Sequence, residues 1–318
     1  MALTKSDILN YRGNLYIVGQ NQTPFLSMIG GLNGGKRVPS PEFSTSVEGA
    51  TNSASQNTQS EDTASAAGTP TTYTKTPKNN TVQIMKYDAA VTFRKSSSSN
   101  GWFGGLNNGE AGSSPDSLSF QKNMALLQMA KDLDYSFIQG TYVQAASTAT
   151  NAKTRGIIEA TTTNAIAAGG AALSKAIFDS VLKAMYNSGA PMSNVVALVG
   201  ADQKVNLSNI YGYAPTSRNV GGVNIQQLET DFGNIGIVLE PNMPSTAIQL
   251  VEMSVTVPVF NPIVFDGNAA PMVDAVNGSD VLWVKVGTTS AQFGGFYYAQ
   301  TGLDYGPETY HGKITGLA

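Results

Sequence analysis

A long polar stretch decides how the fold is interpreted, and from Pro41 to Asn80 it reads PEFSTSVEGATNSASQNTQSEDTASAAGTPTTYTKTPKNN. Its bulky apolar residues are Phe43, Val47 and Tyr73, and most of the others are Ser, Thr, Ala, Gly, Asn and Gln. A segment with so little to bury cannot form a core of its own and by composition should be disordered. If it is ordered, contacts outside the segment must hold it, and neighbouring copies of the same chain are the simplest candidate.

The residues on either side of this stretch predict a hairpin that returns into a strand. Apolar residues alternate with period two through Val82 and Ile84 and then from Tyr87 to Phe93, with a phase slip at Met85-Lys86. This pattern predicts a strand that carries a β-bulge at the slip. Before the hairpin, Pro24 and a glycine cluster discourage one long helix, so we interpret this region as an arm.

The clearest helix of the chain is predicted between Asp116 and Gln139. Apolar residues recur at spacings of three and four until Gly140, and Ser114 or Asp116 can cap the start. Such a helix has about 22 residues and a length of roughly 33 Å. Asp132 and Asp134 point to different faces of it, so we interpret both as solvated charges.

From Asn151 onward the pattern is mixed α/β, so the fold class is α+β. Ser174 can cap a second helix, Val195–Val199 reads as a buried central strand, and Asp202–Ile210 as a shorter helix. Further strands are predicted at Val223–Leu228, Ile235–Leu239, Ala247–Met253, Val281–Val286 and Gln292–Ala299, with a last edge strand at Glu308–Ile314.

The composition limits the functional class. The chain has 318 residues, of which 41% are hydrophobic, enough for a substantial core. Charged residues make up 13%, below the roughly 25% of average soluble proteins, and a neutral polar surface is better tolerated when other subunits cover it. The formal net charge of −3 argues against a dedicated nucleic-acid binder. No apolar run is long enough to span a membrane and no signal-peptide pattern opens the chain, so we expect no membrane partner.

Residues suited to catalysis or metal binding are few. The chain has no Cys and one His, which excludes thiolate sites and imidazole clusters, so we expect no cofactor and no metal. His311 is assigned a structural or surface role. The carboxylate pairs Glu61-Asp62 and Asp304 with Glu308 leave glycoside hydrolysis open, because that reaction needs only two carboxyl groups.

One glycine-rich stretch imitates a phosphate-binding loop. Gly30–Lys36 has the spacing G-x-x-x-x-G-K, but Arg37 follows where Ser or Thr should reach magnesium. The next residues, Val38-Pro39, cannot start the helix that would hold the phosphates. We therefore interpret the stretch as a hinge in the arm.

The charges of the polar stretch are divided between its two halves. The outgoing half carries Glu42, Glu48, Glu61 and Asp62, and the returning half carries Lys75 and Lys78. A hairpin would therefore present both signs, either to solvent or to complementary charges on an adjacent subunit.

Taken together, several short motifs resemble the major capsid proteins of tailed bacteriophages. They are Thr23–Gly30, the polar hairpin, the helix ending near Gly140, Thr154–Ile157 and His311–Ile314. The resemblance covers nearly the whole chain and implies the Hong Kong 97-type capsid fold. Its parts would be an N-terminal arm (1–38), an extended loop (39–87), a peripheral domain (88–150) with a spine helix at about 116–139, an axial domain (151–276) and return strands of the peripheral domain (277–318).

The resemblance also implies the function and the partners. The chain would be a non-enzymatic subunit of an icosahedral virus shell, assembled in the host cytoplasm into pentamers and hexamers around packaged double-stranded DNA. A separate scaffolding protein and a portal are expected as partners, with decoration proteins as a further option. The candidate subunit contacts are Pro24, Phe25, Phe43, Glu61, Asp62, Lys75 and Lys78.

Three alternatives stay open on the sequence. An encapsulin-type nanocompartment would share the fold but carry enzyme cargo. A secreted surface-layer or adhesin protein fits the Ser/Thr-rich, Cys-free composition, although no signal peptide is seen. A β-rich polysaccharide hydrolase would require two positioned carboxylates.

Overall fold

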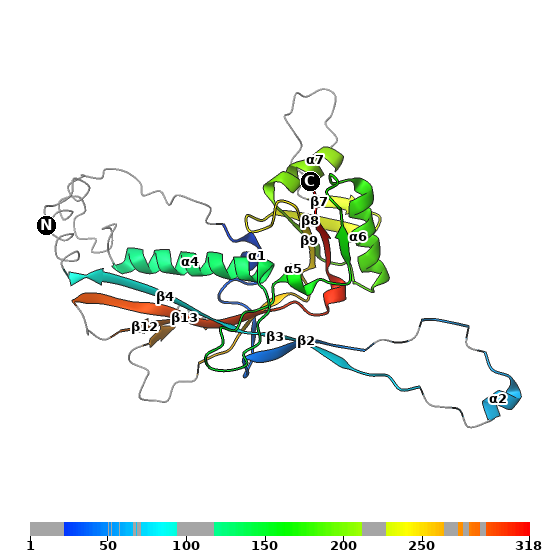
Figure 1. Cartoon of the computed structure of the whole chain (residues 1–318), viewed down its shortest axis with the longest axis horizontal. Helices are drawn as coiled ribbons and strands as arrows, with labels where there is room; N and C mark the ends of the chain where they lie inside the picture. Colours follow the sequence, from blue (N-terminus) through cyan, green and yellow to red (C-terminus); the bar gives the residue numbers. More distant parts are fainter. Residues whose placement is uncertain are drawn as a thin grey trace.

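The computed structural model describes residues 22–49, 51, 53–56, 58–65, 68, 71–93, 118–211, 227–263, 273–275, 280–286 and 291–318. Helices and strands are both present, so the α+β prediction is confirmed. The strands form two six-stranded sheets and a separate two-stranded hairpin, and a long helix lies beside the longest strands (Figure 1).

The first sheet is built around β13 (Gln292–Asp304) and has the order β1-β10-β13-β12-β11, with β4 (Gln83–Thr92) on the other edge of β13. The remaining strands are β1 (Lys36–Arg37), β10 (Val257–Phe260), β11 (Val273–Ala275) and β12 (Leu282–Lys285). At Gly295 of β13 an added Cβ would lie 2.3 Å from the carbonyl oxygen of Val284, so the close approach of β12 requires glycine.

The spine helix is the most accurate prediction from the sequence. The helix α4 spans Leu118–Gln139, and its 22 residues match the predicted length. Its buried face packs against β4 and β13 in one apolar cluster that includes Leu133, Phe137, Met85 and Ala299. The proposed caps Ser114 and Asp116 lie outside the described residues.

The predicted bulge in β4 is wrong. The strand pairs with β13 in continuous register from Gln83 to Thr92, and Met85, Ala89 and Val91 all point inward. Ile84 is the residue that breaks the apolar pattern, because its side chain is 65% exposed. The register irregularity lies in the hairpin instead, between Ser44 and Ser46.

The second sheet has the order β5-β14-β9-β6-β8-β7. Its central strand β6 (Val195–Val199) is buried at every residue, as predicted. The other strands are β5 (Ala165–Ala167), β7 (Gln227–Thr230), β8 (Gly233–Leu239), β9 (Ile248–Glu252) and β14 (Gly312–Thr315).

The helices of this second part agree with the sequence. Lys175–Asn187 forms α6, whose first turn is capped as Ser174 Oγ accepts a hydrogen bond from the backbone N–H of Ile177 (3.3 Å). Ala201–Tyr211 forms α7. Two short helical elements were not predicted. They are α5 (Ile157–Ala160) and a 3-10 helix, η3 (Glu308–Tyr310), which occupies the start of the strand predicted at Glu308–Ile314.

The end of the chain differs from the prediction. The strand β14 is not an edge strand, because it lies between β5 and β9 in the second sheet. It therefore does not join the first sheet with the other strands of segment 277–318. Conversely, β10 and β11 lie in the first sheet, although both fall inside the segment 151–276 assigned to the axial domain. Of the predicted strand Val223–Leu228, residues 223–226 lie outside the described part.

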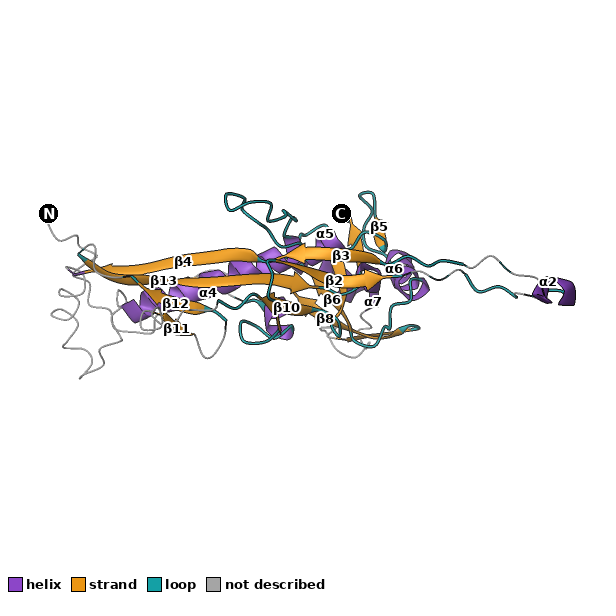
Figure 2. Ribbon diagram, turned by 90° about the horizontal axis from the view of Figure 1, so that it is seen from below, coloured by secondary structure: helices purple, strands orange, loops and turns teal. Residues whose placement is uncertain are grey.

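The polar stretch forms the long hairpin that was predicted. Antiparallel strands β2 (Glu42–Glu48) and β3 (Thr76–Thr81) make its base, and the short helix α2 (Glu61–Ser65) lies at its far end. Figures 1 and 2 both show this hairpin projecting away from the two sheets. The first helix of the described chain, α1 (Pro24–Met28), lies close to the junction between α4 and the second sheet (Figure 1).

Candidate functional site

The base of the hairpin is fixed to its own subunit by one buried amide. Asn80 Nδ2 donates to the carbonyl oxygens of Leu303 (2.8 Å) and Arg155 (3.2 Å), and Oδ1 accepts from the backbone N–H groups of Arg155 (2.8 Å) and Thr81 (2.9 Å). Because Asn80 is fully buried, these bonds are shielded from water. The Phe43 ring adds an apolar contact over Gly302 of β13.

Away from the contacts of Asn80 and Phe43, much of the hairpin is exposed. Val47 and Tyr73 are 61% and 60% exposed, and Glu61 and Asp62 are exposed on α2. Lys75 is exposed and Lys78 is half-buried. The projecting part thus offers apolar and charged side chains that the body of its own subunit does not cover.

The arm is fixed to the body at a second buried polar site. The backbone N–H of Leu26 donates to Asp134 Oδ1 of α4 (2.8 Å), and that of Phe25 donates to Glu240 Oε2 (3.0 Å). Asn242 joins the two carboxyl groups, since its Nδ2 donates to Asp134 Oδ2 (2.8 Å) and its backbone N–H donates to Glu240 Oε1 (3.2 Å). We use the name arm junction for the five residues Phe25, Leu26, Asp134, Glu240 and Asn242.

The two carboxyl groups of the arm junction are fully buried. The pKa of Glu240 is raised to about 8. Burial is the largest cause, and the negative charge of Asp134 and a hydrogen bond with Asp134 add to it. The interpretation of Asp134 as a solvated charge is therefore wrong. Its signal in the sequence was its place on the apolar stripe of α4, between Met129 and Phe137, which also point inward.

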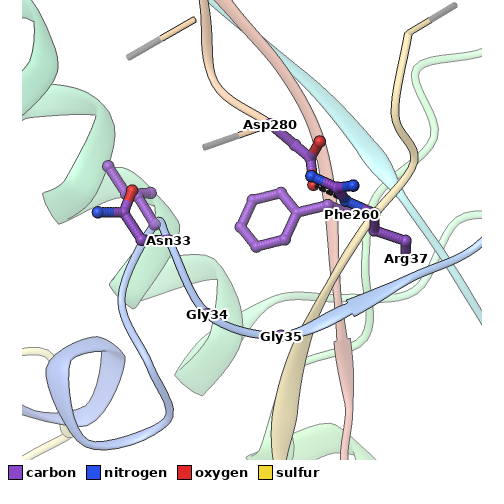
Figure 3. A pocket seen from close by; sticks show the side chains of 7 residues that line it. Asn33, Gly34, Gly35, Arg37, Phe260 and Asp280 are labelled. Atoms are coloured by element: carbon purple, nitrogen blue, oxygen red, sulfur yellow. Dashed lines mark hydrogen bonds and ion pairs between the residues drawn. The ribbon is translucent and has the colours of Figure 1, made fainter. Parts of the chain in front are cut away.

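The glycine-rich stretch after α1 is not a phosphate-binding loop. It leads into the strand β1 rather than a helix, and Gly30, Gly31 and Gly35 all have positive φ. Figure 3 shows the hollow beside it, where the Arg37 guanidinium meets Asp280 (Nε to Oδ2, 2.9 Å). Lys36 is paired with Asp304 (2.7 Å). Both cations of this stretch therefore have carboxylate partners.

The carboxylate pair near the C-terminus has structural partners. Asp304 binds Lys36 and accepts a hydrogen bond from the backbone N–H of Gly306 (3.1 Å). Glu308 accepts from the backbone N–H groups of Thr162 (2.8 Å) and Thr163 (3.1 Å) and from the Thr163 hydroxyl. Burial alone would raise the pKa of Glu308, but these hydrogen bonds outweigh it and lower the pKa. A carboxyl group with a lowered pKa is ionised at neutral pH and is unsuited to act as a general acid.

The single histidine is an interior residue. His311 Nδ1 accepts a hydrogen bond from the backbone N–H of Glu252 (3.2 Å), and Nε2 lies 2.6 Å from the carbonyl oxygen of Tyr305, to which it donates. Burial lowers the pKa of His311 to about 4, so the ring is neutral at pH 7. Each ring nitrogen has a backbone partner, which is a structural role.

The candidate contact residues fall into three places. Phe25 is fully buried in the core of its own chain, so it offers no surface to a neighbour in this conformation. Pro24 is half-buried at the start of α1. Phe43 and Lys78 lie in the paired strands of the hairpin, Lys75 just before β3, and Glu61 and Asp62 at its far end. The structure thus gathers the last five on one projecting element.

Metal-binding and membrane-spanning features are not found in the described residues. Within the part of the chain that the structure describes, no group of three or more His, Cys, Asp or Glu side chains could hold a metal ion. No described helix has the length and apolar character needed to cross a membrane.

The family of this chain follows from a match along its length. The family model of the SU10 major capsid protein matches residues 2–318. The chain belongs to the SU10 major capsid protein family. This SU10-family protein is therefore a structural protein of a virus capsid, as the resemblance implied. Among curated proteins, none matches it.

Solved structures show the fold of this SU10-family protein in assembled shells. A chain of the cyanophage A-1(L) capsid is 14% identical, with 99% of each chain covered and a TM-score of 0.64. A capsid chain of the native GTA particle is 12% identical, with coverage of 99% and 97% and a TM-score of 0.60. The SrpI encapsulin of Synechococcus elongatus PCC 7942 is 10% identical, with coverage of 100% and 96% and a TM-score of 0.57. At such identities the likeness shows the fold alone, and it confirms the Hong Kong 97-type prediction.

Proposed function

We propose that the chain assembles into pentamers and hexamers of an icosahedral shell that encloses packaged double-stranded DNA, and that it catalyses no reaction. The family match supports the capsid role, and the solved neighbours include chains of the cyanophage A-1(L) capsid and of the GTA capsid. The observation that carries the proposal is the projecting hairpin, which is anchored at Asn80 but uncovered beyond its base.

The uncovered part of the hairpin is proposed to contact a neighbouring subunit. The exposed side chains of Val47 and Tyr73 would stabilise a contact with another surface, because that contact removes their apolar area from water. Glu61 and Asp62 at the far end carry negative charge, and Lys75 and Lys78 near the base carry positive charge. Each set can pair with opposite charges on a neighbouring subunit, which fixes the register of the contact more than its strength.

The remaining partners follow from the capsid role. A separate scaffolding protein would guide closure of the shell, and a portal would be a further component of the particle. DNA would be confined without sequence-specific binding, which agrees with a formal net charge of −3. Assembly would take place in the host cytoplasm.

The encapsulin alternative is supported by one observation, the fold shared with the SrpI encapsulin. A nanocompartment encloses protein cargo, whereas a virus shell encloses nucleic acid, so the contents of purified particles distinguish the two. We expect nuclease-protected double-stranded DNA in particles purified from a productive infection. Particles that contain a cargo enzyme and no protected DNA would contradict the proposal.

The hydrolase alternative is weakened by the structure. The pair Asp304 and Glu308 is held by Lys36 and by the Thr162-Thr163 segment. Glu61 and Asp62 lie on the exposed helix α2.

A further inference from the structure

The arm junction brings together three parts of the chain that are distant in sequence. Leu26 belongs to α1, Asp134 to the last two turns of α4, and Glu240 and Asn242 to the loop between β8 and β9. Three hydrogen bonds join these parts, and a fourth lies within the β8–β9 loop. All four are 2.8 to 3.2 Å long. Any movement of the arm away from the body must break the two bonds that the carboxyl groups accept from Phe25 and Leu26.

The charge balance of the junction is unusual. The helix α1 (Pro24–Met28) contributes only backbone N–H groups and contains no titratable side chain. The β8–β9 loop contributes the uncharged Asn242, and α4 contributes Asp134. Elsewhere on α4, Asp132 is directed to β4, where it accepts a hydrogen bond from Tyr87. Lys36 and Arg37 are paired with Asp304 and Asp280.

Asp134 is therefore the charged group that acts on Glu240, and no cation of the described part of the chain is among the groups that shift the pKa of Glu240. Two buried carboxylates without a cation repel each other strongly, so a single proton shared between them is the favoured state. With one proton the pair keeps one negative charge, which suits the two backbone N–H groups at the start of α1.

We propose that Asp134 and Glu240 form a proton-dependent latch that holds the arm against the junction of α4 and the second sheet, and that loss of the shared proton releases the arm. In the closed state the pair binds a proton that two solvated carboxylates would not bind at neutral pH. Opening therefore releases one proton, and opening becomes easier as the pH rises.

The sign and range follow from the ionisation of Glu240. Its pKa is raised from 4.5 in the exposed state to about 8 in the closed state. The shared proton therefore stabilises the closed arm fully below about pH 4.5. This stabilisation falls as the pH rises from about 4.5 to about 8, and it is lost above about pH 8. Within this interval one proton per opening event changes the opening equilibrium about tenfold per pH unit.

Hydrogen–deuterium exchange of the full chain tests the latch. The amides of Phe25 and Leu26 should show protection factors, corrected for the intrinsic exchange rate, that fall about tenfold per pH unit between about pH 5 and 8 and then level off. A peptide from α6 monitors unfolding of the second sheet and should not follow this slope. If the protection of the arm amides does not depend on pH, the proposal is overturned.

Two variants assign the proton to the pair. In Glu240→Gln the amide oxygen can still accept the hydrogen bond from the backbone N–H of Phe25, while the amide nitrogen gives up the acceptor that faces the Asn242 N–H. Because Gln does not titrate, the arm amides should stay protected and their pH slope should disappear. Asp134→Asn removes the other charge and should flatten the slope independently, which keeps the test open if one variant folds poorly. The matched control is Glu229→Gln, an exposed carboxylate of β7 in the same sheet, which should keep the wild-type slope. A wild-type slope in both junction variants would overturn the proposal.

Discussion

At the scale of single residues, Asn80 connects the hairpin to the rest of the subunit. Its side chain makes four hydrogen bonds to backbone groups of β13, β3 and the segment before α5. Such a residue satisfies several buried polar groups at once, and its removal leaves them without partners.

Replacing Asn80 with Ala should therefore destabilise the subunit by roughly 2–4 kcal/mol, because the carbonyl of Leu303 and the N–H of Arg155 lose their partner in the interior. Chemical denaturation of the unassembled chain measures this change. The neighbouring Asn79 is exposed on the same strand, so Asn79→Ala should change stability by less than about 0.5 kcal/mol. Equal effects of the two variants would show that Asn80 is not the anchor.

His311 should make stability depend on acid pH. Its pKa is lowered from 6.5 to about 4 in the folded chain, so between these values the unfolded state binds a proton that the folded state does not. Stability contributed by the neutral ring is present above about pH 6.5 and is lost as the pH falls toward 4, by roughly 3 kcal/mol in total.

The variant His311→Gln isolates this effect. Gln does not titrate, so urea unfolding at pH 7, 5.5 and 4.5 should show a smaller loss of stability in acid than the wild type shows. At pH 7 the variant should be the less stable of the two, because Gln cannot reproduce both hydrogen bonds of the ring. Parallel pH profiles for the two proteins would contradict the account of His311.

At the scale of elements, the hairpin combines a fixed base with an uncovered far end. Residues 49–75 can be replaced by Asn-Gly, which joins the paired residues Glu48 and Thr76 by a two-residue turn. This change removes Glu61, Asp62, Tyr73 and Lys75 but keeps Asn80 and the β2–β3 pairing.

We expect this truncated chain to keep its circular dichroism spectrum and cooperative melting but to stop forming shells. The control replaces Ser53–Gln56 with Gly-Ser-Gly-Ser, which keeps the length of the hairpin and its charged residues. Unchanged shells from the truncated chain, seen by negative-stain microscopy, would disprove a contact role for the far end.

The elements also show what sequence patterns predict well. The spine helix α4, the helix α6 with its Ser174 cap and the buried strand β6 were predicted closely, because each has a long apolar period or a continuous apolar run. The register of β4 was predicted wrongly, since exposed Ile84 was counted as an inward residue. A surface isoleucine on a strand carries the same local signal as a buried one.

Non-local pairing was the harder part. Nothing within Gly312–Thr315 indicates that β14 lies between β5 and β9, because the partner strands are far away in the sequence. The arm junction was missed for the same reason: Asp134 and Glu240 become partners only when α4 meets the β8–β9 loop. By contrast, the exposed charges of the hairpin could be located from the sequence, because composition alone separated that segment from the core.

At the scale of the whole molecule, the described part of the chain has two sheets, a spine helix and a hairpin that projects away from the sheets (Figure 2). A chain with 13% charged residues has a weakly charged surface that neighbouring copies can cover. Closure of a shell then stabilises each copy by mass action, although every single contact is modest.

Particle mass and negative-stain images test most directly whether this chain forms closed shells. The full chain should be expressed alone and together with the proposed separate scaffolding protein. We predict closed icosahedral particles of uniform size in at least the second preparation. A stable monomer in both preparations would contradict the account.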